Sequence, residues 1–371
     1  DEGHAAEHFR NYGAWTARYV YGRILPNLRK VGTRGFLYLY GPEPPFNGCD
    51  SGDCARKWIH VSNRYIDLCL KADPKLKYFH LFGEPNARWF RFNAGAEDYA
   101  RFFNQWATET HKRFPQIKLG GPVTWGTPTR NAQWDGWCKT LLDTAHANLD
   151  FLDWHSYGGT STKLEGDLHV VTGYGKMLCG KWIRNVVSET NINVGSRKNW
   201  HDRRVHYTKR AVAMMKQTFA FLRHPDKIFS RQFHDYAAWA GSYDARFLGT
   251  DKLPVTPMMQ LYKISKPLRG TRVLTKNPFD DVLLEAAVGQ ETLAVAIANV
   301  GQASKEVPLS LVGLPADGLQ GTAKILTAAG LADFALPNNG LSGSLSLPAE
   351  SLVVASWTTK QPLWAQRTQA R

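Results

Sequence analysis

The fold is decided by the stretch Lys77-Tyr78-Phe79-His80-Leu81-Phe82-Gly83-Glu84-Pro85-Asn86. Its first six residues are mostly aromatic or apolar, too few for a helix and typical of a strand buried on both faces. Gly83 then allows the backbone to turn, and Glu84 follows directly. In a barrel of parallel strands, the carboxyl ends of the strands open onto the active-site face. We therefore expect Glu84 at the mouth of such a barrel, where it would act as a catalytic acid.

Strands alternate with helices on both sides of this stretch. Apolar segments predict six buried strands, at residues 35–41, 77–83, 117–124, 149–158, 182–189 and 228–239. Helical periodicity predicts helices at residues 5–30, 56–72, 97–114, 134–147, 166–179, 201–222 and 256–266. This spacing is typical of βαβ units and a parallel sheet. A closed barrel of this class has eight strands. We therefore expect its first two strands to be missing from this sequence, the alternative being a wrong strand count.

The pattern changes after Gly270. Short alternating segments broken by Gly, Pro and Asn occupy residues 282–287, 292–299, 304–311, 321–326, 343–347 and 351–358. Short strands with frequent turns predict a small antiparallel sandwich. The expected fold is therefore α/β, with a (β/α)8 TIM barrel at residues 1–271 that lacks its first strands. A β-sandwich accessory domain with a tail follows at residues 272–371.

A second carboxylate ends the strand three further along the chain, in Val186-Val187-Ser188-Glu189-Thr190-Asn191. Strands four and seven of an eight-stranded barrel lie on opposite sides of its mouth, so Glu84 and Glu189 can face each other. Two carboxylates about 5 Å apart suit retaining glycoside hydrolysis, in which one protonates the leaving oxygen and the other attacks the sugar. The alternatives are structural: Glu84 could cap or pair with the following helix, and Glu189 could form a salt bridge to a neighbouring strand.

Polar and aromatic side chains follow other strands of the predicted barrel. His155 and Tyr157 end one strand, where an imidazole could orient either carboxylate and a Tyr hydroxyl could keep the nucleophile ionised. An isolated His at a strand end can equally be an ordinary satisfied polar group. Sugar stacking is expected of Trp125 and Trp239, while packing is an equal alternative for Trp89 and Trp200.

Positive charge is concentrated on the predicted barrel. The net charge is +14, with 39 Lys and Arg against 24 Asp and Glu in residues 1–270, and 7 against 8 in the remainder. A positive field attracts polyanions, and bidentate Arg suits sulfate or carboxylate. Nucleic acid is not expected, because no recognition motif accompanies the charge. Recurrent loop cations instead favour an anionic glycan, although any one of them could be a solvated surface residue: Arg88, Arg91, Arg130, Lys163, Arg197, Lys198 and Arg246.

Five cysteines leave at least one outside any internal pair. Cys49 and Cys54 flank a polar loop and could close a small disulfide, but unpaired thiols are an equal alternative. We predict no metal site. No apolar run approaches the roughly 18 residues of a membrane span. No signal peptide opens the sequence, which we therefore expect to be a mature or trimmed form.

Four motifs resemble the landmarks of clan A glycoside hydrolases, which are retaining (β/α)8-barrel enzymes. In chain order they are Gly83-Glu84-Pro85-Asn86, Gly120-Gly121-Pro122, Asp153-Trp154-His155-Ser156-Tyr157 and Ser188-Glu189-Thr190. The C-terminal sandwich is similar to the accessory domain of the xylosidase/iduronidase family. The segment from Gly35 to Gly41 and the basic, aromatic loops look most like the β-agarase and β-porphyranase family, whose members cut red-algal galactans, some of them sulfated.

The resemblance implies roles for individual residues. Glu84 would be the acid/base and Glu189 the nucleophile, with His155 and Tyr157 supporting them. Most clan members have an Asn before the acid/base that contacts the sugar 2-hydroxyl, whereas Gly83 stands at that position here. Either Asn86 or another loop takes that role, or the 2-position is handled differently.

These observations predict a retaining endo-β-glycoside hydrolase of a red-algal galactan, secreted or periplasmic, with no cofactor and no membrane partner. One alternative is an exo-acting β-xylosidase or α-L-iduronidase-like enzyme of the same clan. Another is a non-catalytic protein that binds anionic glycans.

Overall fold

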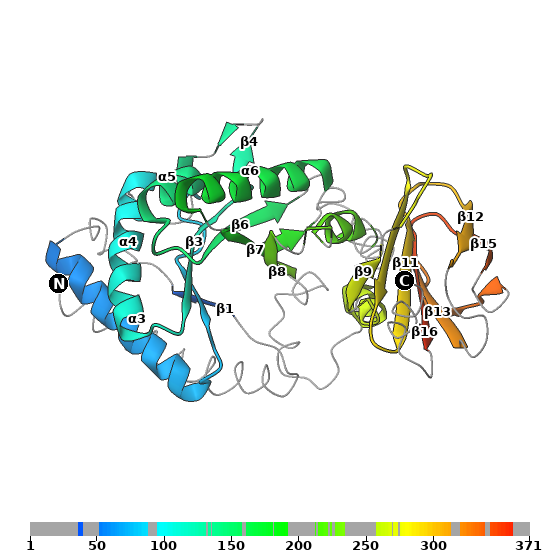
Figure 1. The fold of residues 1–371 in the computed structure, drawn as a ribbon, viewed down its shortest axis with the longest axis horizontal. Coiled ribbons are helices and arrows are strands. Elements are labelled where there is room, and N and C mark those ends of the chain that lie inside the picture. The colour runs from blue at the N-terminus through cyan, green and yellow to red at the C-terminus, as the bar shows by residue number, and fades with distance from the viewer. Residues whose placement is uncertain are drawn as a thin grey trace, which may run out of the picture. The chain divides into compact units, whose positions relative to one another are not determined.

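The computed structural model describes most of the chain (Figure 1). The described residues are 36–39, 52–87, 95–130, 133–134, 136–157, 161–180, 182–191, 212, 214–221, 223–224, 227–233, 257–268, 270–273, 275–312, 320–337 and 342–358, with side chains for most of them. The chain forms two compact units. The first comprises residues 1–157, 163–190 and 224–232, and the second comprises 158–162, 191–223 and 233–371.

The first unit is built on a six-stranded sheet in which the strands follow one another in sequence order, β1-β2-β3-β6-β7-β8. The pairs β1–β2, β2–β3 and β3–β6 are parallel. The strands are β1 (Phe36–Leu39), β2 (Tyr78–Leu81), β3 (Lys118–Thr124), β6 (Phe151–Tyr157), β7 (Arg184–Asn191) and β8 (Ile228–Phe233). Each lies within or beside one of the six predicted segments, so the predicted α/β fold is confirmed.

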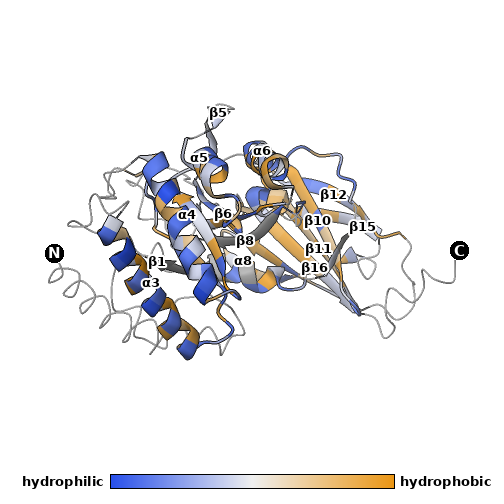
Figure 2. Cartoon of the chain, turned by 60° about the vertical axis from the view of Figure 1, so that its left-hand side comes forward, coloured by the Kyte–Doolittle hydropathy of each residue, from blue (hydrophilic) through white to orange (hydrophobic). Residues whose placement is uncertain are grey.

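Four amphipathic helices accompany this sheet: α3 (Gly52–Ala72), α4 (Ala96–Arg113), α5 (Gly136–Ala145) and α6 (Ser161–Cys179). Figure 2 shows hydrophilic residues along one face of α3 and of α4 and apolar residues along another. The apolar faces meet at Trp58, whose ring centroid lies 5.3 Å from that of Phe82 and 5.2 Å from that of Phe102. Aromatic edge contacts of this kind stabilise a core beyond simple burial. They fix the turn after β2 against two helices.

Three helix predictions in this unit need correction. The helix expected from residue 56 begins earlier, at Gly52. The helix expected from residue 134 begins at Gly136, because Trp134 belongs to β5 (Gln133–Trp134), which pairs antiparallel with β4 (Thr129–Arg130). The helix expected from residue 166 begins earlier, at Ser161. The predicted helix at residues 5–30 lies outside the described residues. Most of the helix predicted at 201–222 does too, although residues 212 and 214–221 are helical.

Strand β3 lies unusually close to its neighbours at two glycines. A Cβ added to Gly120 would lie 2.1 Å from the Phe151 ring, and one added to Gly121 would lie 2.4 Å from the Tyr99 hydroxyl. That hydroxyl donates a hydrogen bond to the Leu81 carbonyl (2.7 Å). Real Cβ contacts are not this short, so the Gly-Gly pair is required by the packing of β2, β3, β6 and α4.

The second unit contains two antiparallel sheets. The larger has the order β14-β13-β16-β11-β10-β9, and β12 pairs with β15. Leu293, Ile297 and Trp357 from the larger sheet share one core with Val307 and Leu345 from the smaller. The strands are β9 (Thr271–Val273), β10 (Val282–Val288), β11 (Thr292–Asn299), β12 (Lys305–Ser310), β13 (Gln320–Thr327), β14 (Gly330–Phe334), β15 (Ser342–Leu347) and β16 (Ser351–Thr358). The sequence predicted six of these eight and missed β9 and β14.

Helical residues cover a second core of the same unit. Met214 and Phe219 pack with Leu261 of α8 (Pro257–Ser265) against Ala296 and Leu352 of the larger sheet. These helical segments therefore belong to the same compact unit as the strands. The predicted domain boundary at residue 272 stays a prediction.

Cys54 is disulfide-bonded, in agreement with the first of the two cysteine alternatives, and Cys49 lies outside the described residues. Cys69 and Cys138 are buried. Among the helices of the described segments, none has the length and apolarity to cross a membrane.

We expect G120A to destabilise the protein by about 1–3 kcal/mol or more, because the added methyl group overpacks the site against Phe151. G173A is the matched control. It lies within α6, where an added Cβ meets nothing within 4 Å, so it should stabilise by about 0.5–1 kcal/mol through lower unfolded-state entropy. Urea denaturation of both variants measures the difference. Equal stability of G120A and wild type would contradict the packing argument.

Asp150, just before β6, offers a test at acid pH. Burial raises its pKa, but hydrogen bonds with His111, Lys118 and the Leu119 backbone N–H outweigh burial and hold the pKa below its usual value. Its stabilisation is therefore present above about pH 4, the unfolded value, and is lost as pH falls through the folded value. D150N should cost about 1–3 kcal/mol at pH 7. The difference from wild type should vanish at low pH, and a constant difference in urea denaturation would refute the assignment.

Candidate active site

The turn after β2 presents Glu84 in an unusual backbone conformation. Phe82 (φ 59°) and Glu84 (φ 51°) both lie in the left-handed region, as does Val123 (φ 54°) at the end of β3. The Glu84 N–H donates to the Val123 carbonyl (2.9 Å), which joins the two strained segments. The sequence assigned this turn to Gly83, but its left-handed residues include the two that flank Gly83. Such positions cost about 1–3 kcal/mol each for residues other than glycine, and they cluster at functional sites.

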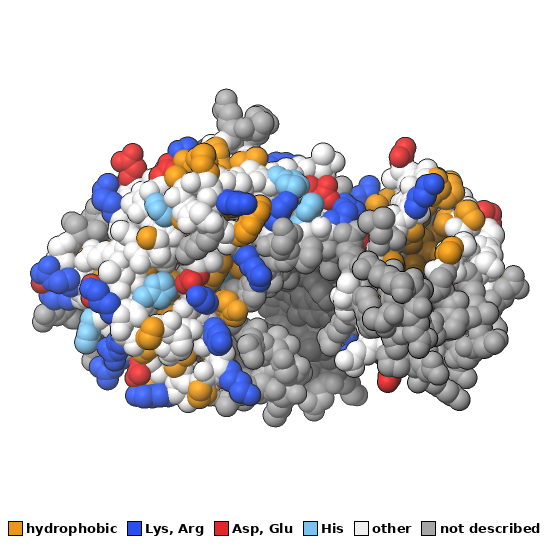
Figure 3. Space-filling view, viewed as in Figure 1, with side chains coloured by type: hydrophobic (Ala, Val, Ile, Leu, Met, Phe, Trp, Pro, Cys, Tyr) orange, Lys and Arg blue, Asp and Glu red, His pale blue; other side chains and the backbone are white. Residues whose placement is uncertain are grey.

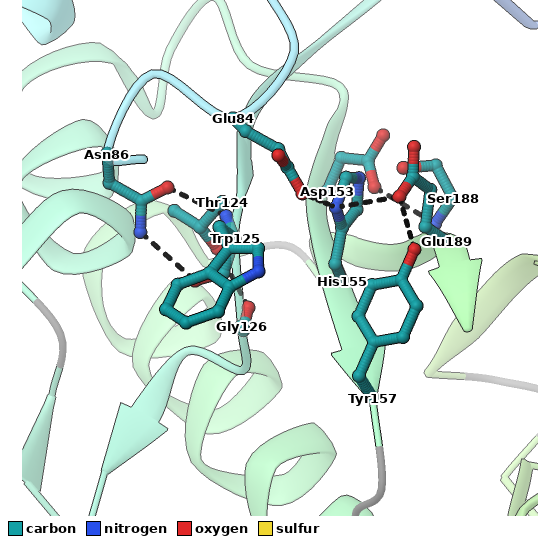
Figure 4. Close-up of polar contacts among 10 residues, drawn as sticks. All are labelled: Glu84, Asn86, Thr124, Trp125, Gly126, Asp153, His155, Tyr157, Ser188 and Glu189. Atoms are coloured by element: carbon teal, nitrogen blue, oxygen red, sulfur yellow. Dashed lines mark hydrogen bonds and ion pairs between the residues drawn. The ribbon is translucent and has the colours of Figure 1, made fainter. Parts of the chain in front are cut away.

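Glu84 and Glu189 converge on one histidine (Figure 4). His155 Nδ1 lies 2.7 Å from Glu84 Oε1 and 3.3 Å from Glu189 Oε2. The ligand atoms of the three residues all lie within 4.8 Å of one another. The structure therefore brings together the two carboxylates and the histidine that the sequence singled out. The carboxylates are partly accessible, with side chains 17% and 26% exposed, while His155 is buried.

Tyr157 completes this cluster. Its hydroxyl donates a 2.5 Å hydrogen bond to Glu189 Oε2. Residues two apart on a strand point to the same face, which is why Tyr157 and His155, both on β6, reach the same carboxylate. Tyr157 can thus support Glu189 as the sequence predicted.

The same three residues, Glu84, His155 and Glu189, also offer ligand atoms that can bind a divalent cation. Two carboxylate oxygens and an imidazole nitrogen are found at many metal sites. A cation bound to them would engage the carboxylate oxygens to which the resemblance assigns proton transfer and nucleophilic attack. Glu84, His155 and Glu189 are the group with this property among the described residues.

Sequence reasoning missed a second, buried layer. Asp153 and His80 have no exposed side-chain surface and contact each other through Asp153 Oδ2 and His80 Nδ1. Asp153 Oδ1 accepts a hydrogen bond from the Ser188 backbone N–H (3.2 Å). The two-residue alternation Asp153, His155, Tyr157 was the signal that could have placed Asp153 beneath the cluster.

Asn86 holds the neighbouring loop by two hydrogen bonds. Its Nδ2 donates to the Trp125 carbonyl (3.2 Å), and its Oδ1 accepts from the Trp125 N–H (2.7 Å). The Trp125 side chain is 54% exposed. Asn86, two residues after Glu84, therefore positions the exposed Trp125 near Glu84 (Figure 4).

Among the predicted rim cations, Lys163 is the one whose side chain the structure describes. Lys163 donates to the Thr127 hydroxyl and the Thr129 carbonyl and pairs with Asp167 (2.7–2.8 Å), so it has a structural role. In Figure 3, Lys and Arg side chains are spread over the visible face of the first unit. Arg130 belongs to β4, but its side chain is not described. The other predicted rim residues lie outside the described residues: Arg88, Trp89, Arg91, Arg197, Lys198, Trp200, Trp239 and Arg246.

The chain is similar to known proteins in sequence and in fold. No protein-family profile matches the chain. A curated β-agarase from Pseudoalteromonas atlantica is 24% identical over 253 residues, covering 59% of this chain and 48% of that protein. BuGH86, solved in complex with neoagarooctaose, aligns with TM-score 0.64 and 17% identity over 82% of this chain and 55% of its own. The predicted resemblance is confirmed.

Two further structures share the fold. A β-porphyranase of glycoside hydrolase family 86 from the human gut bacterium Bacteroides plebeius aligns with TM-score 0.60 and 16% identity, over 77% of this chain and 57% of its own. A family 51 α-L-arabinofuranosidase from Thermotoga petrophila aligns with TM-score 0.65 and 14% identity, over 90% and 77%. The chain thus spans about half the length of the β-agarase and of the two agarase- and porphyranase-type structures.

N86A should release the Trp125 loop. Loss of the hydrogen bond to the Trp125 N–H removes about 1 kcal/mol, so hydrogen exchange of that amide should accelerate about fivefold. The Leu119 amide, which donates to Asp150 Oδ2 (3.0 Å), is the internal control and should be unaffected. Unchanged exchange at Trp125 would show that the Asn86 side chain does not hold the Trp125 backbone in solution.

Proposed function

We propose that this chain is a retaining endo-β-glycoside hydrolase of a red-algal galactan of the agarose or porphyran type. The observation that carries the proposal is the separation of Glu84 and Glu189, whose facing oxygens lie within 4.8 Å across His155. Retaining enzymes hold their carboxyl groups about 5–5.5 Å apart, whereas inverting enzymes need about 6.5–9.5 Å to admit a water molecule. The short distance favours direct attack by one carboxylate.

In this mechanism Glu84 donates a proton to the glycosidic oxygen as the bond to the anomeric carbon breaks. The Glu189 carboxylate attacks that carbon and forms a glycosyl-enzyme ester. Water then hydrolyses the ester, with Glu84 as the general base that takes the proton back. Tyr157 donates to Glu189 Oε2 (2.5 Å) and can hold the carboxylate of the nucleophile in place. His155 lies against both carboxylates and can orient them.

The fold assigned to this activity is a (β/α)8 barrel followed by an accessory β-sandwich from about residue 272. The six-stranded sheet with the site residues at or just after the carboxyl ends of β2, β6 and β7 supports the first assignment. The shared core of two antiparallel sheets supports the second.

Substrate class is supported by the similarity to a β-agarase and to a structure containing neoagarooctaose. The exposed Trp125 near Glu84 can stack on a sugar ring. The net charge of +14 favours an anionic, sulfated galactan. The disulfide at Cys54 suits a secreted or periplasmic location, because disulfides persist in oxidising compartments.

A second candidate is an exo-acting glycosidase of the same clan, of the β-xylosidase or α-L-iduronidase type. Its support is the likeness to an α-L-arabinofuranosidase over 90% of this chain. Digestion products separate the two candidates. A ladder of oligosaccharides supports endo cleavage, and release of monosaccharide alone would replace the galactan proposal with the exo-acting one.

The decisive experiment measures reducing-sugar release from agarose, porphyran, carrageenans, xylan and glycosaminoglycans. Wild type should act on agarose or porphyran, and proton NMR should show the β-anomer as the first product. E189A should fall to background, while E84Q should lose about 10²–10⁴-fold in kcat through loss of general acid catalysis.

D143N is a matched control, since Asp143 is a carboxylate paired with Lys139 on α5 and should keep full activity. Full activity of E189A would remove that residue as nucleophile. Binding of sulfated galactan without any hydrolysis would favour the non-catalytic alternative.

A further inference from the structure

A fully buried polar pair lies beneath the carboxylates. His80 of β2 and Asp153 of β6 contact each other with neither side chain exposed. The remaining carboxylate oxygen of Asp153 accepts the Ser188 N–H of β7 (3.2 Å). One carboxylate therefore joins three strands through side-chain and backbone contacts.

Each residue of these contacts lies close in sequence to a member of the Glu84–His155–Glu189 cluster. His80 stands four residues before Glu84, Asp153 two residues before His155, and Ser188 immediately before Glu189. Figure 4 shows Asp153 and Ser188 beside Glu189 and His155. A movement of Asp153 would displace the strand ends that carry the cluster.

The pair spans a strand that lies between its members. β2 and β6 are both neighbours of β3 and not of each other. His80 is in register with Gly120 of β3, and the Phe151 ring occupies the space that a Gly120 side chain would fill. The His80 ring packs against that Phe151 ring, with centroids 5.1 Å apart. The glycine and the aromatic ring thus allow His80 to reach Asp153 across β3.

A gain in folding stability does not by itself explain why a buried His–Asp pair is present. Removing a carboxylate from water is costly, and buried ion pairs are often no more stabilising than apolar residues of the same size. Fixed geometry is a better reason, since a misplacement of about 1 Å can cost about 100-fold in rate.

We propose that His80 and Asp153 are positioning residues that set the separation of Glu84 and Glu189. The kinetic part of this inference rests on the proposed hydrolase function, but the structural part does not. Neither residue touches the substrate. Both act through the strands that carry the two carboxylates.

The test compares D153N with D150N in the full chain. Asp150 is a matched control, because it too contacts a histidine, His111, and accepts a backbone N–H, from Leu119. D153N should lower kcat about 10–100-fold with KM within twofold of wild type. Its crystal structure should show the Glu84 and Glu189 carboxylates further apart. D150N should lose stability yet keep both kcat and the carboxylate separation.

A double-mutant cycle with H80Q examines the pair as a unit. If the two side chains act together, H80Q/D153N should be no slower than the slower single variant. Multiplicative losses, or a normal kcat per folded molecule in D153N, would overturn the inference.

Folding failure is also informative. If D153N and H80Q both fail to fold where D150N folds, the pair serves folding and the positioning role is wrong. If wild type hydrolyses none of the glycans but D153N still widens the carboxylate separation, the proposed function fails while positioning stands.

Discussion

The interaction on which the site depends is the contact of one imidazole nitrogen with two carboxylates. Two carboxylates about 5 Å apart would repel by about 3 kcal/mol at an effective dielectric constant of 20 if both were ionised, so a close pair needs hydrogen-bonding partners or a proton on one member. Glu84 and Glu189 approach to within 4.8 Å because His155 Nδ1 lies between them and the Tyr157 hydroxyl donates to Glu189. Burial of His155 fixes the ring, so the distance between the carboxylates is set by the scaffold and not by solvent.

Strands β2 and β3 hold this geometry with locally unfavourable backbone conformations. Left-handed φ values at Phe82, Glu84 and Val123 are unfavourable for residues with a Cβ, and they occur together at the ends of β2 and β3. The Phe82 ring is buried against Trp58 and Phe102, which prevents the turn from relaxing. Packing in the core thereby stabilises a backbone conformation that the local sequence does not favour.

The sequence predicted the features that depend on a residue pattern within a single segment. The six strands of the first unit, and the placement of Glu84 and Glu189 at strand ends, follow from short apolar runs and the rule for parallel sheets. The His80–Asp153 contact depends on register across three strands, and the contacts of Lys163 with Thr127 and Thr129 depend on where the β4 segment folds, so neither was visible in the sequence. The turn was assigned to Gly83 because glycine is the usual left-handed residue, whereas tertiary contacts impose that conformation on Phe82 and Glu84.

The hydrogen bonds of Asn86 bear on the alternatives left by Gly83. The resemblance places an Asn before the acid/base in most relatives, and Asn86 was one candidate to replace it at the sugar 2-hydroxyl. Both ends of its amide bond the Trp125 backbone (3.2 and 2.7 Å). A sugar hydroxyl that bound Asn86 would have to compete with these two hydrogen bonds and would release the backbone of the exposed Trp125. In the proposed enzyme, this cost favours recognition of the 2-position by another loop or a different scheme, and the role we propose for Asn86 is to position Trp125.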